Sequence, residues 1–251
     1  MYLETIPEAM CDCIVSFENK KMPPVPKNPG RILAVDPGLV NFAACVTNTA
    51  CRPLLIDGRQ LMSANRFFNK EYKRLLGQLP KGQSTSSRIE AMIKKRNNRM
   101  WDFFFKAAHV ICRYADHEHV ELILYGFTND RSGNEDILFP IPYGTFFQIL
   151  RWVASGYSIA VDLQEESSTS EMDFLAGTDS EETCVMCGKR IFRGLYHSRT
   201  GAVINADVNA AANILKKRKP DAFLGVSPDS LLSVSVIRYG DLYHPKSITS
   251  D

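Results

Sequence analysis

The sequence predicts an α/β fold in which a mixed β-sheet is flanked by helices, and three observations carry this prediction. Residues 31–57 contain apolar strand patterns separated by short turns, as in an antiparallel meander. Residues 63–116 show apolar positions at helical spacing. Residues 120–166 then alternate as strand, helix and strand, which is typical of a βαβ unit. The sheet is therefore expected to begin before the helical insertion and to continue after it.

The composition is that of a globular cytoplasmic protein. The chain has 251 residues, which suits one large domain with attachments, and a net charge of +2 neither requires nor excludes a polyanionic partner. It contains no run of about 18 apolar residues, and its first residues lack the pattern of a secretion signal. The 7 Cys residues form no even framework, which fits a reducing compartment. We therefore expect a cytoplasmic location and no membrane partner.

The first half of the chain divides at about residue 30. Residues 1–29 hold one weak strand pattern and a Pro-rich connector. The stretch "RILAVDPGLVNFAACVTN" then predicts two strands around the turn at Pro37 and Gly38, and "RPLLIDG" predicts a third. Two long helices are expected within 63–116, separated by the polar break "PKGQSTSS".

The second half returns to the sheet. The strand "VELILYGF", the helix "YGTFFQILRWVASG" and the strand "SIAVDLQEE" follow in order, and a polar, acidic loop comes next. A helix is expected across residues 201–217, "GAVINADVNAAANILKK". Residues 219–251 have weak periodicity and are expected to form an appended tail over the surface. The main domain is therefore expected at 30–218.

Two distant aspartates attract functional interest. Asp36 ends a buried apolar strand, where an unpaired carboxylate costs several kcal/mol and is normally hydrogen-bonded, ion-paired or metal-bound. Asp207 lies in the first turn of the last helix, where capping is an ordinary explanation. Together, a strand ending in Asp, a Gly turn and a late helix beginning with Asp follow the order of the ribonuclease H type of fold. Carboxylates suit magnesium, and paired ions can catalyse phosphodiester hydrolysis.

Three segments strengthen this interpretation: "RILAVDPGLVNFAACVTN", "CVMCG" and "GLYHSRTGAVINADVNAAANILKK". Over residues 30–218 the chain resembles the ribonuclease H-like (RuvC) nuclease half of the TnpB proteins of insertion sequences, which are related to the smallest CRISPR type V effectors. The resemblance implies a DNA endonuclease that uses Mg²⁺ or Mn²⁺, with Asp36 and Asp207 as metal-binding acids. An actin-like ATPase would carry further Gly-rich phosphate loops, which this sequence lacks.

TnpB proteins usually have a long amino-terminal half that grips a guide RNA, whereas only about 30 residues precede the predicted nuclease domain here. The opening "CDCIVSFENKKMPP" resembles the last strand and linker of that half. Guide RNA is therefore an expected partner if the missing half is supplied, and DNA is expected as the substrate. The alternative is a truncated, catalytically inactive nucleic-acid-binding remnant or repressor.

The resemblance also implies a third acid, commonly a Glu at the end of the strand "VELILYGF", where this chain has Tyr125. Glu165 and Glu166 end the neighbouring strand and can take this place, because adjacent parallel strands end at the same edge of a sheet; of the two, Glu166 is favoured. Asp130 is a further candidate for the third acid. A solvated acidic loop remains the alternative for the two glutamates.

The resemblance places the first half of a zinc ribbon at Cys184 and Cys187, and counting back from Asp207 puts His197 and Thr200 in the second half. Thr is a poor ligand, so Cys184, Cys187 and His197 fall one short of a closed zinc site, and zinc is left open. Residues 184–201 are therefore expected to form a degenerate zinc-ribbon hairpin. Its basic residues are phosphate-contact candidates: Arg190, Arg193 and Arg199.

A second basic cluster, "KKRNNR", lies inside the helical insertion. Its candidates for nucleic-acid contact are Lys94, Lys95, Arg96 and Arg99. Residues three and four apart share a helix face, so Lys95 and Arg99 line up and can follow a phosphate backbone. A solvated helix face is the alternative. The aromatic run that follows, including Phe103 and Phe104, is expected to pack in the core rather than stack on bases.

Overall fold

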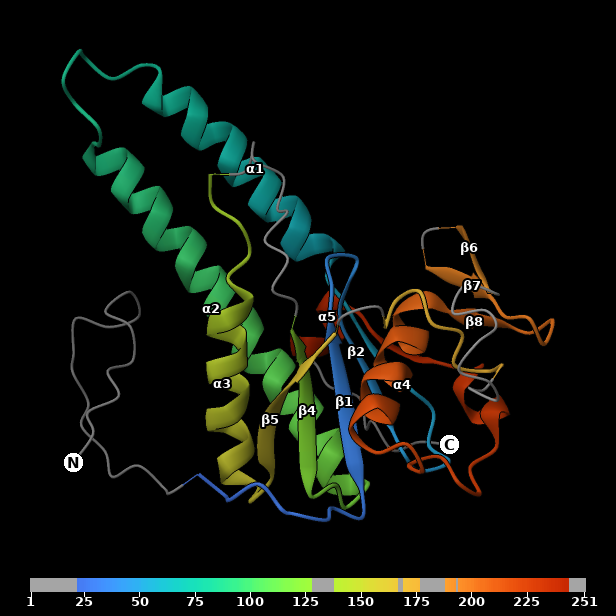
Figure 1. Cartoon of the computed structure of the whole chain (residues 1–251). Coiled ribbons are helices and arrows are strands. Elements are labelled where there is room, and N and C mark those ends of the chain that lie inside the picture. The colour runs from blue at the N-terminus through green and yellow to red at the C-terminus, as the bar shows by residue number, and fades with distance from the viewer. Residues whose placement is uncertain (1–21, 128–137, 167–168, 177–187, 193, 244–251) are drawn as a thin grey trace.

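The computed structural model describes residues 22–127, 138–166, 169–176, 188–192 and 194–243. Within them a six-stranded mixed sheet has the order β5-β4-β1-β2-β3-β9 (Figure 1). Its strands are β1 (Ile32–Pro37), β2 (Asn41–Thr47), β3 (Leu54–Asp57), β4 (Leu122–Phe127), β5 (Ala160–Glu165) and β9 (Ser235–Ile237). The first three strands form an antiparallel meander, and β4 and β5 add to β1 in parallel. The predicted α/β fold with a mixed sheet is confirmed.

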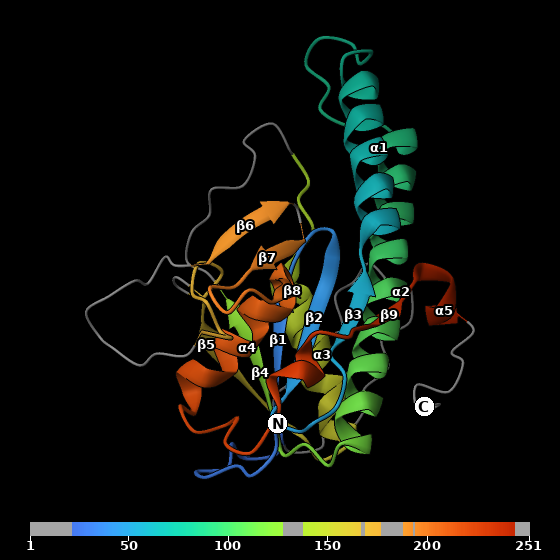
Figure 2. The same cartoon turned by 90° about the vertical axis from the view of Figure 1, so that its right-hand side faces the viewer.

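Helices cover both faces of this sheet (Figures 1 and 2). They are α1 (Arg59–Leu76), α2 (Ser87–His117), α3 (Tyr143–Gly156), α4 (Ala206–Arg218), the 3₁₀ turn Pro228–Leu231 and α5 (Tyr239–Tyr243). Helices α2 and α3 pack on one face and α4 on the other, while the α1–α2 hairpin projects beyond the sheet. None of the helices in the described ranges combines the length and apolar character of a membrane span.

Strand β1 divides its side chains between the two faces. Leu33 and Val35 are buried in the cluster formed with α2 and α3, whereas Ala34 is buried in the cluster that includes Ile214 of α4. Because successive side chains of a strand alternate, Asp36 belongs to the face covered by α4. The Asp36 carboxylate at the end of β1 is therefore directed toward the start of α4, which is the only long helix on that face among the described residues.

The opposite face is closed by aromatic side chains. Phe42 of β2 lies 4.8 Å from the ring of Phe103, 5.5 Å from Phe104 and 4.6 Å from Phe146, measured between centroids. All four are fully buried. Burying such a side chain contributes about 1.5 to 3 kcal/mol. The expectation that Phe103 and Phe104 pack in the core is confirmed.

The expected helix at 201–217 begins later in the structure. Val203–Asn205 form β8, the edge strand of a separate three-stranded sheet. In this sheet β7 (Leu195–His197) is central and pairs with β8 on one side and with β6 (Lys189–Phe192) on the other. Helix α4 starts at Ala206, because Asn205 is extended and its side chain caps the following amides. The helical sequence pattern of residues 201–217 therefore also covers residues that form a short strand.

Residues 219–243 add a strand and a short helix to the fold. β9 pairs in parallel with β3, and the Ser235 amide donates to the Pro53 carbonyl at 2.8 Å. Tyr239 of α5 stacks on Phe103 with centroids 5.9 Å apart. A strand of three residues is too short to give a period-2 signal, so the sequence pattern alone does not reveal this sixth strand.

Candidate active site

Asp36 stands at the carboxyl end of β1, next to a tightly fixed turn. The Gly38 amide donates to the Phe42 carbonyl at 3.2 Å, and the Tyr143 hydroxyl donates to the Gly38 carbonyl at 2.7 Å. A Cβ atom on Gly38 would lie 2.7 Å from the Asn41 carbonyl oxygen, so the turn requires glycine. Burial, followed by the charges of two other acids, raises the pKa of Asp36 well above its usual value.

Those two acids are Glu166 and Asp207. Asp207 does not cap its own helix, because the Asn205 side chain accepts from the Asp207 and Val208 amides at 3.0 and 3.1 Å. The Asp207 carboxylate instead accepts a 2.7 Å hydrogen bond from Asn41 Nδ2 and lies 3.3 Å from an Arg190 nitrogen. The capping explanation for Asp207 is therefore unnecessary.

Glu166 directly follows β5, and its backbone is fixed on both sides. Its amide donates to the Phe127 carbonyl at 2.9 Å, and its carbonyl accepts from the Thr169 amide at 2.9 Å. Its Oε1 atom is buried without a hydrogen-bond partner. Burial raises the pKa of Glu166 to about 7, while a hydrogen bond with Asp36 acts in the opposite direction. Asp36 and Glu166 therefore act as a coupled pair that retains a proton near neutral pH.

A glycine makes room for Glu166. The register of β1 and β4 pairs Val35 with Tyr125, so the residue beside Asp36 is Gly126. A Cβ atom at Gly126 would lie only 2.0 Å from Glu166 Oε1. Tyr125 stands where the sequence resemblance puts the third acid, but its side chain lies on the opposite face of the sheet. There it packs against Phe147 of α3, with ring centroids 5.3 Å apart.

The other candidates for the third acid lie elsewhere. The Glu165 side chain is exposed, and its carboxylate lies 4.0 Å from the Lys217 ammonium. Asp130 falls outside the described residues. Asn41, which holds Asp207, was missed by sequence reasoning; its only signal was its place at the start of the second strand, directly after the Asp-Pro-Gly turn.

The donor chemistry of this cluster fits a hard divalent cation. The cluster has three carboxylates, and one of their oxygens, Glu166 Oε1, is buried without a partner. Burial, and then the charges of Glu166 and Asp207, raise the pKa of Asp36. Across the described ranges, however, no three acidic, His or Cys side chains form a metal-ligand set. The Asp207 carboxylate contacts Arg190 and Asn41 instead.

The zinc-ribbon candidates are only partly described. Cys184, Cys187 and Arg193 fall outside the described residues. His197 is exposed on β7, opposite Lys189, and the Thr200 hydroxyl donates to Ser198 Oγ at 3.0 Å within a turn. Arg199 is exposed, and its amide donates to Asp173 at 2.8 Å. Zinc at this hairpin stays a prediction.

The basic cluster of α2 is split between two faces. The side chains of Lys94, Lys95 and Arg99 are exposed. Arg96 turns inward and donates to Asn65 Oδ1 at 2.9 Å and to the Pro140 carbonyl at 2.7 Å, and its guanidinium lies over the Phe68 ring. Arg96 therefore anchors residues 139–140 to the α1–α2 hairpin, and its contact with nucleic acid stays a prediction.

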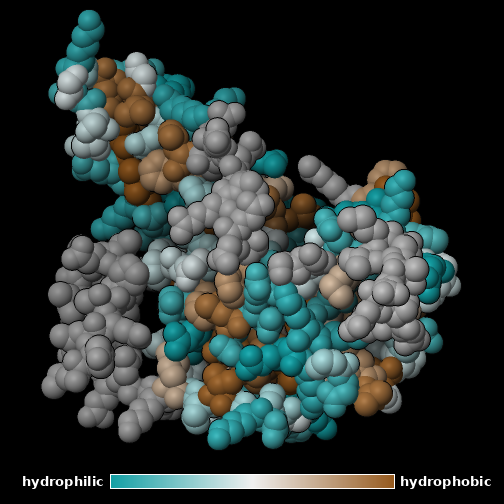
Figure 3. All heavy atoms as spheres, viewed as in Figure 1, coloured by the Kyte–Doolittle hydropathy of each residue, from teal (hydrophilic) through white to brown (hydrophobic). Residues whose placement is uncertain are grey.

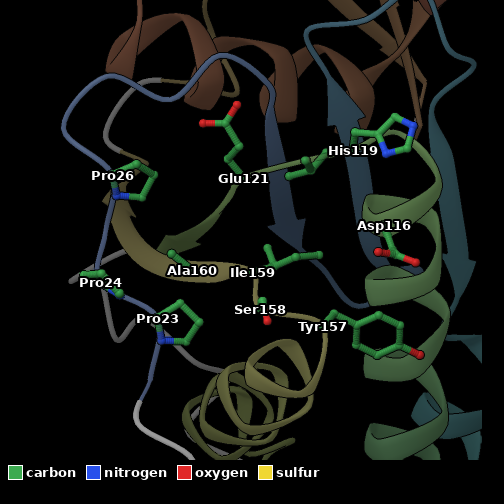
Figure 4. A pocket seen from close by; sticks show the side chains of 11 residues that line it. Pro23, Pro24, Pro26, Asp116, His119, Glu121, Tyr157, Ser158, Ile159 and Ala160 are labelled. Atoms are coloured by element: carbon green, nitrogen blue, oxygen red, sulfur yellow. The ribbon is translucent and has the colours of Figure 1, made fainter.

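A cavity among the described residues lies away from the acids. It measures about 420 Å³ and separates prolines of the connector, Pro23, Pro24 and Pro26, from Tyr157 and Asp116 (Figure 4). Glu121 and Ala160 in its lining mark the amino ends of β4 and β5. Asp36 and Glu166 stand at the carboxyl ends of β1 and β5, which is where open α/β sheets usually place their sites.

Comparison with known proteins agrees with this fold. Residues 14–127 match the family OrfB_IS605, described as a probable transposase. A Cas12f1-sgRNA-target DNA complex contains a similar chain, with 17% identity and a TM-score of 0.52, over 74% of this chain and 49% of that one. A CRISPR-Cas12f ternary complex gives 16% identity and a TM-score of 0.52, over 76% and 40%.

The chain thus spans less than half of the length of these solved structures. A comparison with curated protein sequences gives no match. The family match covers β1 to β4 with the α1–α2 hairpin, and the structural matches extend over about three quarters of the chain. Together they support the resemblance to the TnpB family that the sequence shows.

Proposed function

We propose that the chain is a RuvC-like nuclease domain that hydrolyses DNA phosphodiesters with Mg²⁺ or Mn²⁺ held by Asp36, Glu166 and Asp207. One observation carries the proposal: Asp36 is buried at the end of β1, close enough to Glu166 and Asp207 for the charges of both to act on it. Gathering three carboxylates is costly without a cation, so such a cluster favours metal binding over a structural role.

Each group has a distinct task in this proposal. Two bound divalent ions would activate a water molecule and stabilise the leaving oxygen. Asp36 and Glu166 hold a proton that binding of the cation must release. Asn41 orients the Asp207 carboxylate, and Arg190 brings a positive charge that can meet a substrate phosphate.

Guided cleavage depends on nucleic-acid partners. One similar chain belongs to a Cas12f1-sgRNA-target DNA complex, and this chain spans 49% and 40% of the lengths of the two Cas12f chains. We therefore propose DNA as the substrate and guide RNA as a partner. Lys94, Lys95 and Arg99 form an exposed basic stripe that suits phosphate contact. The cytoplasmic location stays a prediction.

A second candidate is an inactive nucleic-acid-binding remnant or repressor. The ion pair between Arg190 and Asp207 favours it, because a guanidinium occupies one oxygen of a proposed metal ligand. If that pair is permanent, the acids stabilise the fold and the basic surfaces still bind DNA.

A cleavage assay separates the two candidates. End-labelled single-stranded DNA is incubated with Mg²⁺ or Mn²⁺ and the full chain, beside Asp36→Ala. Metal-dependent products from the wild type alone support the nuclease. Identical products from both proteins exclude catalysis at this site, and DNA binding without any cleavage favours the remnant.

A further inference from the structure

One turn of the sheet joins two parts of the candidate site. Asp36 is the penultimate residue of β1, just before this turn. Asn41, whose side chain donates to the Asp207 carboxylate at 2.7 Å, begins β2 just after it. Within the turn, the Gly38 amide donates to the Phe42 carbonyl at 3.2 Å. A shift of the turn would therefore displace both carboxylates together.

Tyr143, the first residue of α3, fastens this turn from the opposite side. Its hydroxyl donates to the Gly38 carbonyl at 2.7 Å, and its ring stacks on the ring of Phe42 with centroids 5.8 Å apart. A partly buried carbonyl that loses its donor is left unsatisfied, so this hydrogen bond favours one position of the turn. The tyrosine therefore contacts the turn midway between Asp36 and Asn41.

Tyr143 is itself held in place by the α1–α2 hairpin. The segment before it is anchored at Phe139, whose amide donates to Asn69 Oδ1 at 2.9 Å and whose carbonyl accepts from Asn65 Nδ2 at 2.9 Å. The Phe139 ring packs against Phe68 of α1, with centroids 5.2 Å apart. Figure 1 shows this segment beside the hairpin, and Figure 3, in the same view, shows apolar side chains gathered on that side of the hairpin. The tyrosine thus lies on a fixed support, which a group that positions others requires.

We propose that Tyr143 is a positioning residue of the metal site: its hydroxyl holds the turn so that Asp36 and Asp207 face the same divalent cation. This role rests on the proposed function, and it adds a residue that binds neither the metal nor the substrate. Removing a group that orients metal ligands typically lowers metal affinity about 10- to 100-fold. Because the tyrosine acts through the turn, its effect should also be measurable without metal.

Tyr143→Phe removes the hydroxyl and keeps the ring that stacks on Phe42. In calorimetric titration of the full chain, its affinity for Mn²⁺ should be about 10-fold lower than that of the wild type. Cleavage of end-labelled single-stranded DNA at subsaturating Mn²⁺ should fall to the same extent, with an unchanged KM for DNA. Raising the Mn²⁺ concentration about 10-fold should restore the rate. A residue that only stabilised the fold would not show this dependence on metal.

Tyr114→Phe is the matched control. The buried Tyr114 hydroxyl donates to the Arg52 carbonyl at 2.8 Å, so the same kind of hydrogen bond is lost. Arg52 precedes β3, which runs parallel to β1, and this bond therefore lies at the edge of the sheet opposite Asp36. Both variants should have similarly lowered melting temperatures, whereas only Tyr143→Phe should lose affinity for Mn²⁺. An equal loss of affinity in both variants would overturn the proposal.

Amide hydrogen exchange measures the turn in the absence of metal. Two amides report on it: that of Gly38, and that of Gly58, which donates to the Val40 carbonyl at 2.8 Å. In metal-free Tyr143→Phe both should exchange about 2- to 12-fold faster than in the wild type, which is the factor that corresponds to the loss of one hydrogen bond. In Tyr114→Phe their exchange should be unchanged.

The failure of this role and the failure of the proposed function are distinguishable. Absence of Mn²⁺ binding in the wild type refutes the proposed function, and faster exchange at Gly38 in Tyr143→Phe then still supports the hold of the tyrosine on the turn. Equal Mn²⁺ affinity in the wild type and Tyr143→Phe refutes the positioning role and leaves the proposed function standing. Unchanged exchange at Gly38 refutes the positioning role in either case.

Discussion

Gly126→Ala perturbs the proposed site without touching a proposed ligand. The new Cβ atom would lie 2.0 Å from Glu166 Oε1 and 2.7 Å from Ile214 Cδ1, both shorter than real Cβ atoms tolerate. The Ile214 methyl lies in a buried cluster and can give little. The Glu166 carboxylate must therefore move by about 1 Å or more, and overpacking of this kind costs about 1 to 3 kcal/mol.

Two effects should follow with opposite signs. When Glu166 is displaced, its Oε1 atom leaves a buried position in which it has no hydrogen-bond partner, and this gain offsets part of the free energy lost to overpacking. We therefore expect a net loss of stability of only about 1 kcal/mol. The affinity for Mn²⁺ should fall at least about 10-fold, because misplacing one coordinating group has effects of that size. Isothermal titration with Mn²⁺ and urea unfolding measure the two quantities.

A matched control and a double-mutant cycle sharpen this test. Gly144→Ala adds the same methyl group in α3, where nothing lies within 4 Å, and should leave the metal affinity unchanged. Gly126→Ala combined with Glu166→Ala should bind metal no worse than Glu166→Ala alone, because the methyl acts through that carboxylate. Wild-type metal affinity in Gly126→Ala would refute the reasoning.

Further outcomes concern the acids and the basic surfaces. The pKa of Glu166 in the folded state is about 7, above the ordinary 4.5, so without metal its contribution to stability is complete below pH 4.5 and is lost as the pH rises through 7. The loss is about 2 kcal/mol after allowing for partial exposure, and it should be smaller in Glu166→Gln. Urea unfolding at pH 5 and at pH 8, with a chelator present, measures it. Asn41→Ala should lower Mn²⁺ affinity about 10-fold in calorimetry, because Asp207 loses its 2.7 Å hydrogen bond. Arg96→Ala should cost about 1 to 3 kcal/mol in unfolding, since it leaves the Oδ1 atom of the buried Asn65 without its donor. Charge reversal at Lys95 and Arg99 should weaken DNA binding and reduce its dependence on salt, and unchanged titrations would argue against a nucleic-acid stripe.

The sequence predicted the frame of the fold because its main elements carry strong periodic signals. The apolar run before Asp36, the two long helices and the strand-helix-strand alternation each extend over enough residues to show their period. The strands β8 and β9 have 3 residues each, too few for such a signal, and were missed. Their place is decided by pairing with β7 and β3, which is tertiary information.

The site was predictable at its two aspartates and less so around them. Glu166 could be favoured over Glu165 but not distinguished physically, because the face that each residue occupies depends on the register of β5 with β4. For the same reason, the sequence places Tyr125 at the position beside Asp36, where the structure has Gly126. A run of basic residues does not reveal that Arg96 turns toward Asn65 while Lys95 and Arg99 stay exposed.

The claim on which the account depends is that Asp36, Glu166 and Asp207 share a divalent cation. Calorimetric titration of Mn²⁺ into the metal-free protein, in two buffers of different ionisation enthalpy near pH 7, measures binding and proton release together. We predict binding accompanied by release of up to one proton, because Asp36 and Glu166 retain one when no metal is bound. Glu166→Gln should weaken the binding and abolish the release. Absence of Mn²⁺ binding, or equal binding and proton release in the wild type and Glu166→Gln, would contradict the account.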